Sequence, residues 1–309
     1  MARGRLTVAA CGIAVAVLSA GCAPQVHSSA APPAAMPLRL ALADNAHLPD
    51  TSSKAKEVVV ARAVLAAKAD VVAAGPALLD APSATSARCP AEMALVEDRV
   101  CVDRWEATIV ERIPGGERAW SPFLAIDGHE SSVRAVSRSG VVPQAYISGD
   151  QAARACHASG KRLCRADEWE AACRGPSHTT FPYGNERRAG ACNDDIRSMH
   201  PVAEIAQLLS VKRDDMWRDT MNSPLINQLE GGLLPSGERQ FCTNDYGVYD
   251  MVGNLHEWID DPDGTFRGGF YMDTTKNGDG CSYGTQAHDF TYHDYSTGFR
   301  CCLSADPIE

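Results

Sequence analysis

The sequence has a deficit of positive charge and, after Leu18, no long hydrophobic run. Its 39 acidic residues outnumber its 29 basic ones, and the formal net charge of -10 argues against nucleic acid and anionic membrane surfaces as partners. With 45% hydrophobic and 22% charged residues, the composition gives no sign of a membrane span beyond the N-terminal segment. C-x-x-C pairs are also lacking, and the adjacent Cys301 and Cys302 have poor geometry for one tetrahedral metal. These absences favour disulfides over a cysteine metal site.

The N-terminus has the pattern of an export signal. Arg3 and Arg5 precede an apolar run from Leu6 to Leu18 that is too short to span a bilayer, so residues 1–21 are predicted to be a signal peptide. The small residues before Cys22 are typical of a bacterial lipobox. We therefore expect Cys22 to be lipidated and the protein to be anchored in the bacterial cell envelope by its lipid alone, with simple secretion as the alternative.

The segment that follows, residues 22–86, is predicted to be a tether. It is rich in Ala, Pro and Ser and has almost no aromatic residues, so it cannot bury enough apolar area to offset its ordering entropy. Within it, residues 54–74 have helix-forming composition and a weak apolar stripe. This stretch is interpreted as a stalk helix or, alternatively, a partner-binding helix.

Cysteine usage indicates an oxidising compartment. Ten cysteines lie between Cys89 and Cys302, and an even number in an exported domain predicts a disulfide framework. Cys89 and Cys101 flank a short stretch and suggest a hairpin bridge. The spacing alone assigns no other pair.

One domain is expected over residues 87–309, a length that can bury a sizeable core without splitting. Residue patterns predict two strands, at 93–96 and 100–108, and two helices, at 148–159 and 167–174. Arg165 is expected to cap the second helix poorly. Residues 176–243 have little periodicity and predict irregular loops rather than regular structure. The residues alone thus indicate a disulfide-rich α+β domain.

Five motifs resemble, in the right order, the signature of the formylglycine-generating enzyme family, also called the sulfatase-modifying-factor domain. They are Gly160-Lys161-Arg162-Leu163, Glu168-Trp169-Glu170, the run from Tyr246 to Trp258, Phe266-Arg267-Gly268-Gly269-Phe270, and the run from Ser296 to Cys302. The resemblance implies a modified C-type-lectin-like fold, coil-rich and disulfide-bonded. It also matches Cys156, Cys173 and Cys301 to family cysteines and implies a Cys156–Cys301 bridge, which the chain-entropy model values on the order of 4 kcal/mol.

The resemblance further implies calcium. The family's ligands fall on Asp250, Gly253, Leu255 and Glu257, a mixture of carboxylate and carbonyl oxygens that suits a hard cation. Asn193 and Asp194 are the weaker candidates for a second site. A plainer interpretation is that Asn254 and Glu257 only hydrogen-bond the turn.

The family's catalytic positions are changed. Family oxidases use two cysteines after an Arg-Gly-Gly-Ser segment to bind copper and activate oxygen, but here Phe270 replaces the serine and Asp273 the first cysteine. Cys281 lies near the position of the second. An aspartate cannot supply the soft thiolate that Cu(I) prefers, so formylglycine generation is not expected and Cys281 is predicted to be half of a structural bridge.

A polar cleft is predicted from the remaining residues of this region: Asp273, His288, His293, Asp294 and Tyr295. Histidines and carboxylates suit iron or zinc, but the spacing matches no strong metal motif. A polar ligand pocket or a surface hydrogen-bond network is therefore preferred to a catalytic metal.

Three function classes remain. The first is a domain that binds an exported peptide, protein or glycan; lectin-like folds are used in this way, which is a fold-level analogy. The second is a metal-dependent oxidoreductase, using copper or iron, that modifies an exported protein or peptide. The third is an envelope protein that only mediates assembly. Loss of the cysteine pair favours the first class over an enzyme.

Overall fold

The computed structural model describes residues 88–194 and 197–305. The predictions for the signal peptide at 1–21, lipidation at Cys22, and the tether at 22–86 with its helix lie outside these residues. Across the two described stretches, none of the helices combines the length and the apolar character needed to cross a bilayer.

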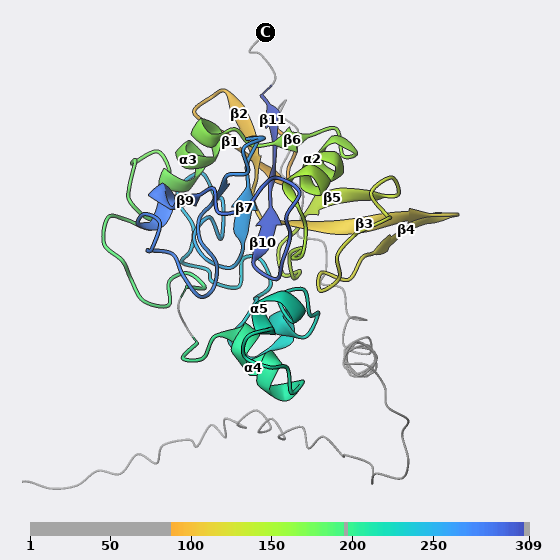
Figure 1. The fold of residues 1–309 in the computed structure, drawn as a ribbon. Helices are drawn as coiled ribbons and strands as arrows, with labels where there is room; N and C mark the ends of the chain where they lie inside the picture. The colour runs from red at the N-terminus through yellow and green to blue at the C-terminus, as the bar shows by residue number, and fades with distance from the viewer. Residues whose placement is uncertain (1–87, 195–196, 306–309) are drawn as a thin grey trace, which may run out of the picture. The chain divides into compact units, whose positions relative to one another are not determined.

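The first hairpin of the domain shares a sheet with its last strand (Figure 1). β1 (Met93–Val96) pairs antiparallel with β2 (Val100–Asp103), and these two short apolar runs form the hairpin that the sequence predicts. β11 (Cys301–Ser304) pairs antiparallel with β2, and β6 (Arg162–Leu163) pairs with the other edge of β11. The two ends of the domain therefore stabilise each other through backbone hydrogen bonds.

The second expected strand is interrupted, and this corrects the prediction of one strand over residues 100–108. β2 ends at Asp103, and β3 (Ala107–Ile113) begins a separate sheet with β4 (Gly116–Ala119) and β5 (Val133–Ser137). The chain leaves the ladder because Glu106 is drawn inward, where its carboxylate accepts hydrogen bonds from distant loop residues.

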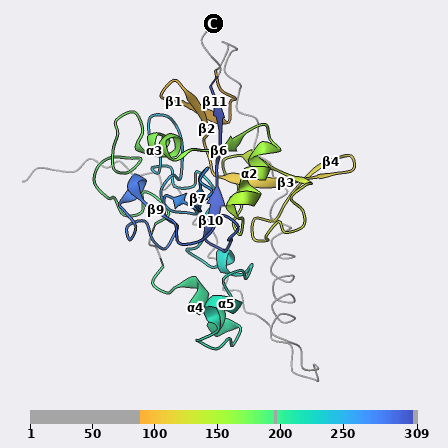
Figure 2. The same ribbon diagram turned by 45° about the horizontal axis from the view of Figure 1, so that its top comes forward.

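The third sheet carries His256 and Glu257, and its loops carry the residues of the predicted cleft. Its order is β10 (Thr297–Phe299), β7 (His256–Trp258), β8 (Phe266–Arg267) and β9 (Gly284–Thr285). β10 runs parallel to β7, and the two strands lie side by side in both ribbon views (Figures 1 and 2). Each strand is only two or three residues long, so the adjoining loops carry most of the residues of this region.

Two helices occur where the sequence predicts them. α2 (Gly149–His157) starts at Ser148, whose hydroxyl accepts a hydrogen bond from the backbone of Gln151 in a capping box. α3 (Ala166–Arg174) follows Arg165, which gives no side-chain cap; instead Glu168 reaches back to the backbone N–H of Arg165 at 2.9 Å. The weak cap expected at Arg165 is thus offset by a carboxylate in the first turn.

The stretch 176–243 is more ordered than predicted. It contains α4 (Pro201–Leu208), α5 (Met216–Asp219) and the 3-10 turn η1 (Ile226–Gln228), so the expectation of irregular loops throughout was wrong. Proline at the first helical position fixes the backbone for helix entry. The buried side chains of α4 then contribute to a separate apolar cluster with residues from η1.

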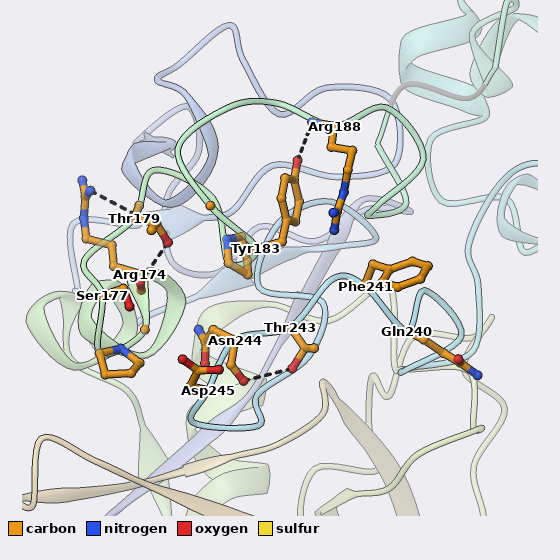
Figure 3. Close-up of a pocket in the computed structure, with 14 residues that line it drawn as sticks. Arg174, Ser177, Thr179, Tyr183, Arg188, Gln240, Phe241, Thr243, Asn244 and Asp245 are labelled. Atoms are coloured by element: carbon orange, nitrogen blue, oxygen red, sulfur yellow. Dashed lines mark hydrogen bonds between the residues drawn. The ribbon is translucent and has the colours of Figure 1, made fainter.

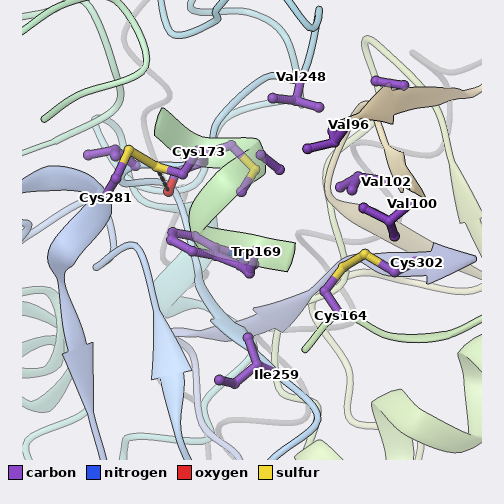
Figure 4. Close-up of a cluster of buried hydrophobic side chains, with 14 of the residues drawn as sticks. Val96, Val100, Val102, Cys164, Trp169, Cys173, Val248, Ile259, Cys281 and Cys302 are labelled. Carbon is purple, nitrogen blue, oxygen red and sulfur yellow. Dashed lines mark hydrogen bonds between the residues drawn. A yellow bond between two sulfur atoms is a disulfide. The ribbon is translucent and has the colours of Figure 1, made fainter. Parts of the chain in front are cut away.

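All ten cysteines of the described ranges form five disulfides. The pairs are Cys89–Cys101, Cys156–Cys301, Cys164–Cys302, Cys173–Cys281 and Cys192–Cys242. Cys281 lies in the 3-10 turn η2 (Gly280–Ser282). Figure 4 shows two of these bridges within the apolar cluster that surrounds Trp169, beside valines of β1 and β2. Four of the five disulfides, all but Cys89–Cys101, are therefore part of the core packing.

Two bridges close almost the same loop, which leads to a testable prediction. Cys156–Cys301 and Cys164–Cys302 span 145 and 138 residues. Replacing one pair by alanine leaves the other, so it should lower the free energy of unfolding by only about 2 to 3 kcal/mol, the value for a ring of about nine residues. Replacing both pairs should lower it by about 7 to 8 kcal/mol, because a loop of about 140 residues is then released.

Urea unfolding of the three variants and the parent chain measures these values. If the loss in the variant without either bridge is no more than the sum of the two single losses, the shared-loop account is wrong. Replacing Cys89 and Cys101, which span only 12 residues, is the control and should add independently to either single loss.

Candidate functional site

A buried ion pair holds the loop that runs into β7. Arg300 has no exposed surface and donates from Nε and Nη2 to the two oxygens of Glu257, each at 2.6 Å. Trp169 of α3 donates its indole N–H to the same carboxylate at 2.7 Å. Glu106 binds the other end of this loop, because it accepts hydrogen bonds from the Asn254 side chain at 2.6 Å and the Leu255 backbone at 3.2 Å.

The loop has a left-handed backbone at three positions. Asp250 and Asn254 have φ values of 57° and 58°, which aspartate and asparagine tolerate better than most residues. Gly253 has φ 81°, and a Cβ there would lie 2.2 Å from the carbonyl oxygen of Asn193. Glycine is therefore required, and it lets the loop lie directly against residue 193.

The charges buried around this loop do not balance. Three carboxylates, those of Glu106, Asp250 and Glu257, are buried with one guanidinium, that of Arg300. Burial raises the pKa of Glu106 well above its usual range, and the nearby Asp250 carboxylate adds to this effect. Burial likewise raises the pKa of Asp250 to about 7. This excess of buried negative charge would be reduced by a bound cation.

Of the two carboxylates predicted to bind calcium, that of Asp250 is better suited than that of Glu257. The Asp250 carboxylate accepts a hydrogen bond from the Gly237 backbone at 2.6 Å and lies in the excess negative charge just described. Both oxygens of Glu257 are already bound by Arg300, and one of them also by Trp169. The described part of the chain contains no group of three or more histidine, cysteine or acidic side chains arranged to hold a metal. Calcium therefore stays a prediction, with carbonyl oxygens required as its other ligands.

The residues of the second candidate calcium site lie next to this loop. Asn193 has a buried side-chain oxygen without a hydrogen-bond partner, and its backbone forms an isolated bridge with Gly253. The Asp194 carboxylate pairs with Arg187 at 2.9 Å. An unpaired buried oxygen suits a cation ligand, whereas the guanidinium beside Asp194 supplies the positive charge that a metal would otherwise provide.

Two of the five predicted cleft residues are brought into one hydrogen-bonded chain. Tyr283 donates to Asp273 at 3.3 Å and lies 3.3 Å from Nε2 of His256. The other ring nitrogen of His256 lies 3.3 Å from the Ser296 hydroxyl, which donates to Asp294 at 2.7 Å. We call this chain, from Asp273 through Tyr283, His256 and Ser296 to Asp294, the buried relay. Because both hydroxyls donate to carboxylates, the neutral imidazole can donate a hydrogen bond to only one of them.

His256 was not among the residues singled out from the sequence. Burial lowers its pKa to about 3, although the Asp273 carboxylate opposes this shift. The imidazole is therefore neutral at pH 7, with one nitrogen as donor and the other as acceptor. A histidine within the family-like motif, beside Glu257 and Trp258, was the available signal; the structure places it at the start of the buried three-residue strand β7.

The other three predicted cleft residues lie elsewhere. His288 stacks on Tyr292 with ring centroids 3.6 Å apart. His293 is 3.1 Å from Asn222 and 3.5 Å from Asp127. Tyr295 packs against aromatic rings and lies 3.4 Å from His200. The five residues therefore do not converge on one point.

The positions that the resemblance matches to the family's oxidase chemistry hold structural groups. Phe270 packs 4.8 Å from the ring of His256. The Asp273 carboxylate accepts hydrogen bonds from the backbone of Thr275 and Lys276, each at 3.1 Å, and so caps a turn. Cys281 is disulfide-bonded to Cys173 of α3. Each of these residues thus has a clear part in packing.

Three small sheets, two capped helices and long loops held by disulfides define a coil-rich α+β domain with the modified C-type-lectin-like architecture that the sequence predicts. The model of the sulfatase-modifying factor enzyme 1-like domain matches residues 125–305, which is more than half of the 309 residues. The chain belongs to this family. The resemblance and the fold class predicted from the sequence are confirmed.

Individual relatives are more distant. The formylglycine-generating enzymes of Mus musculus and Thermomonospora curvata are each 29% identical over 121 residues, or 38% of this chain. The match covers 27% and 33% of those proteins, so the chain spans about a third or less of the curated relatives it matches. Among solved structures, a major tropism determinant I1 variant matches with a TM-score of 0.40 and 13% identity, covering 70% of this chain and 53% of that one. The crystal structure of CarF matches with a TM-score of 0.39 and 18% identity, covering 67% and 87%.

The charge imbalance predicts a calcium response that depends on Asp250. Addition of calcium to the chelator-treated chain at pH 7.5 should raise its melting temperature, because the cation would bind the folded loop and not the unfolded chain. Asp250→Asn keeps the shape and the positive φ but removes the charge, so it should abolish the rise. Calorimetry with and without a chelator measures both.

Asp263→Asn is the matched control, because Asp263 is an exposed aspartate outside the loop, and it should respond like the parent chain. A parent chain that does not respond to calcium contradicts the cation site. An equal rise in Asp250→Asn contradicts its assignment to Asp250.

The buried relay predicts a specific pH dependence. The folded pKa of His256 is about 3, below the ordinary value of 6.5, so its contribution to stability is present above pH 6.5 and is lost as pH falls towards 3. His256→Gln removes this loss. The stability advantage of the parent chain over the variant should therefore shrink by about 1.4 kcal/mol per pH unit between about pH 6 and pH 4.

Urea unfolding at several pH values tests this expectation. His157→Gln replaces an exposed histidine on α2 and should give a profile parallel to that of the parent chain. An advantage over His256→Gln that stays constant with pH would show that the imidazole is not held neutral.

Proposed function

We propose that this chain is an exported lipoprotein whose sulfatase-modifying-factor domain lacks the copper-binding cysteine pair and binds a peptide or glycan. The membrane is contacted by the lipid on Cys22 alone, and nucleic acid is not a partner. The domain sits in the bacterial cell envelope, where its five disulfides are compatible with an oxidising compartment.

One observation carries this proposal: Cys281 is bonded to Cys173 and not to a substrate or a metal. Copper(I) binding by the family requires a pair of thiolates, and a disulfide sulfur is not a thiolate. Asp273 stands in place of the first cysteine and uses its carboxylate to cap a turn. The domain therefore keeps the family's framework while its oxidase position supports structure.

A second candidate is a metal-dependent oxidoreductase with altered chemistry, related to the formylglycine-generating or non-haem iron enzymes. The buried relay favours it, because Asp273, Tyr283 and His256 place acid and base groups at the former oxidase position. Such an enzyme would need copper or iron to activate oxygen. The relay would supply proton transfer only.

The proposal predicts no formylglycine and no bound copper. The full chain is loaded with Cu(I), desalted and analysed for metal, and then incubated with cysteine-containing peptides whose oxidation is followed by mass spectrometry. The formylglycine-generating enzyme of Thermomonospora curvata is the positive control. Near-stoichiometric copper together with conversion of cysteine to formylglycine would overturn the proposal, and bound iron with another oxidised product would favour the second candidate.

A further inference from the structure

A cavity of about 330 Å³ lies beside the C-terminal end of α3 (Figure 3), and none of its lining residues belongs to the buried relay. Its walls include Tyr183, Arg188, Phe241 and Asn244. A second cavity of about 320 Å³ shares Arg188 and Phe241 and is otherwise lined by the small residues 189–191. Since the same two side chains line both, the cavities form one groove on either side of the Arg188–Phe241 pair, which we call the Arg188 groove.

The Arg188 side chain is exposed and is held by aromatic rings. Its guanidinium lies 4.9 Å from the ring centroid of Tyr183 and 5.4 Å from that of Phe241. Neighbouring Arg187 pairs with Asp194 at 2.9 Å, whereas Arg188 has no carboxylate partner in the described stretches of the chain. Two aromatic faces thus orient a planar cation whose N–H groups are left for a ligand.

Phe241 supplies an apolar surface at the same place. Its side chain is 70% exposed, more than that of any other large hydrophobic residue in the described ranges. It precedes Cys242, which is bonded to Cys192, and Tyr183 stacks on the buried Phe181 at 5.5 Å. The aromatic walls are therefore fixed before a ligand arrives, which reduces the entropy cost of binding.

These features favour a peptide over a glycan. A neutral sugar would leave the charge of Arg188 unused, whereas a side-chain carboxylate can accept two hydrogen bonds from the guanidinium. Beside the Arg188–Phe241 pair the second cavity has only the small apolar walls of residues 189–191, whereas the first cavity is also lined by the polar side chains of Ser177, Thr179, Gln240, Thr243, Asn244 and Asp245. Two cavities on either side of one pair suit consecutive side chains of an extended chain, and each has room for a large side chain.

We propose that the Arg188 groove binds an extended segment of an exported peptide or protein that carries an acidic side chain next to an apolar one. The carboxylate pairs with Arg188 and the apolar side chain packs on Phe241. This inference rests on the proposed binding function and names its ligand class and its site. Aromatic residues and arginine are also the side chains that contribute most at protein interfaces.

The test uses the full chain and a positional-scanning library of N-acetylated, C-amidated hexapeptides. Pools differ only in whether a fixed position holds Asp or Glu, or the uncharged Asn or Gln. The parent chain should retain the acidic pools about tenfold better, most strongly when the next position is apolar. Arg188→Gln should lose the acidic preference, and Phe241→Ala the apolar one.

Arg213→Gln is the matched control, because it removes one exposed arginine charge outside the groove and should leave both preferences unchanged. Equal retention of acidic and uncharged pools, or an acidic preference that survives in Arg188→Gln, overturns the inference. Binding of a neutral oligosaccharide or an acidic polysaccharide that is lost in Arg188→Gln, without retention of peptides, also overturns it in favour of a glycan. Peptide retention independent of Arg188 leaves the proposed binding function standing, whereas formylglycine formation removes that function itself.

Discussion

The ion pair between Arg300 and Glu257 is the interaction on which the other features depend. Arg300 also donates to the backbone carbonyls of Asp103 and Tyr249, so one buried side chain joins the first hairpin, the loop before β7 and the last strand. Both charged groups are removed from water and are satisfied by each other, by Trp169 and by these two carbonyls. Loss of either partner would leave a buried charge, which typically costs about 3 to 5 kcal/mol. The loop before β7 therefore keeps its conformation only when the first hairpin and the last strand are both in place.

Three consecutive residues fasten the end of the domain in three directions. Arg300 binds Glu257, Cys301 is bonded to α2 through Cys156, and Cys302 is bonded to Cys164 beside β6. The short sheet around β11 buries little area by itself, so these links replace the packing that longer strands would supply. A domain in which loops predominate can therefore hold buried polar groups in fixed positions.

The sequence predicts best those features that depend on near neighbours. Ser148 caps α2 because a serine and a glutamine at the right spacing suffice for a capping box. The hairpin bridge between Cys89 and Cys101 is similarly local. α4 was missed, since its short apolar stripe is weak until η1 packs against it.

The candidate sites were harder to foresee because tertiary structure assembles them. The buried relay joins His256 to residues 273, 283, 294 and 296, and no single periodicity links these positions. The predicted cleft included its two end carboxylates, but His293 belongs to a different surface. Likewise, the Arg188 groove brings together residues 53 positions apart through the Cys192–Cys242 bridge, whose partner could not be assigned from spacing.

In this domain, one set of residues maintains the fold, and a different, smaller set corresponds to the reactive positions of the family. The motif residues that match the family, such as Trp169, Glu257 and Arg300, are buried and bind one another, so they specify the fold whatever the domain does. The positions that the resemblance matches to the reactive residues of the family oxidases are few, and here they hold an aromatic ring, a turn-capping carboxylate and a disulfide sulfur. Replacing a thiolate by a disulfide converts a reactive atom into a covalent link within the core. Family membership therefore accounts for the architecture, while the exposed Arg188 and Phe241, which the architecture does not require, are the features on which a binding function would act.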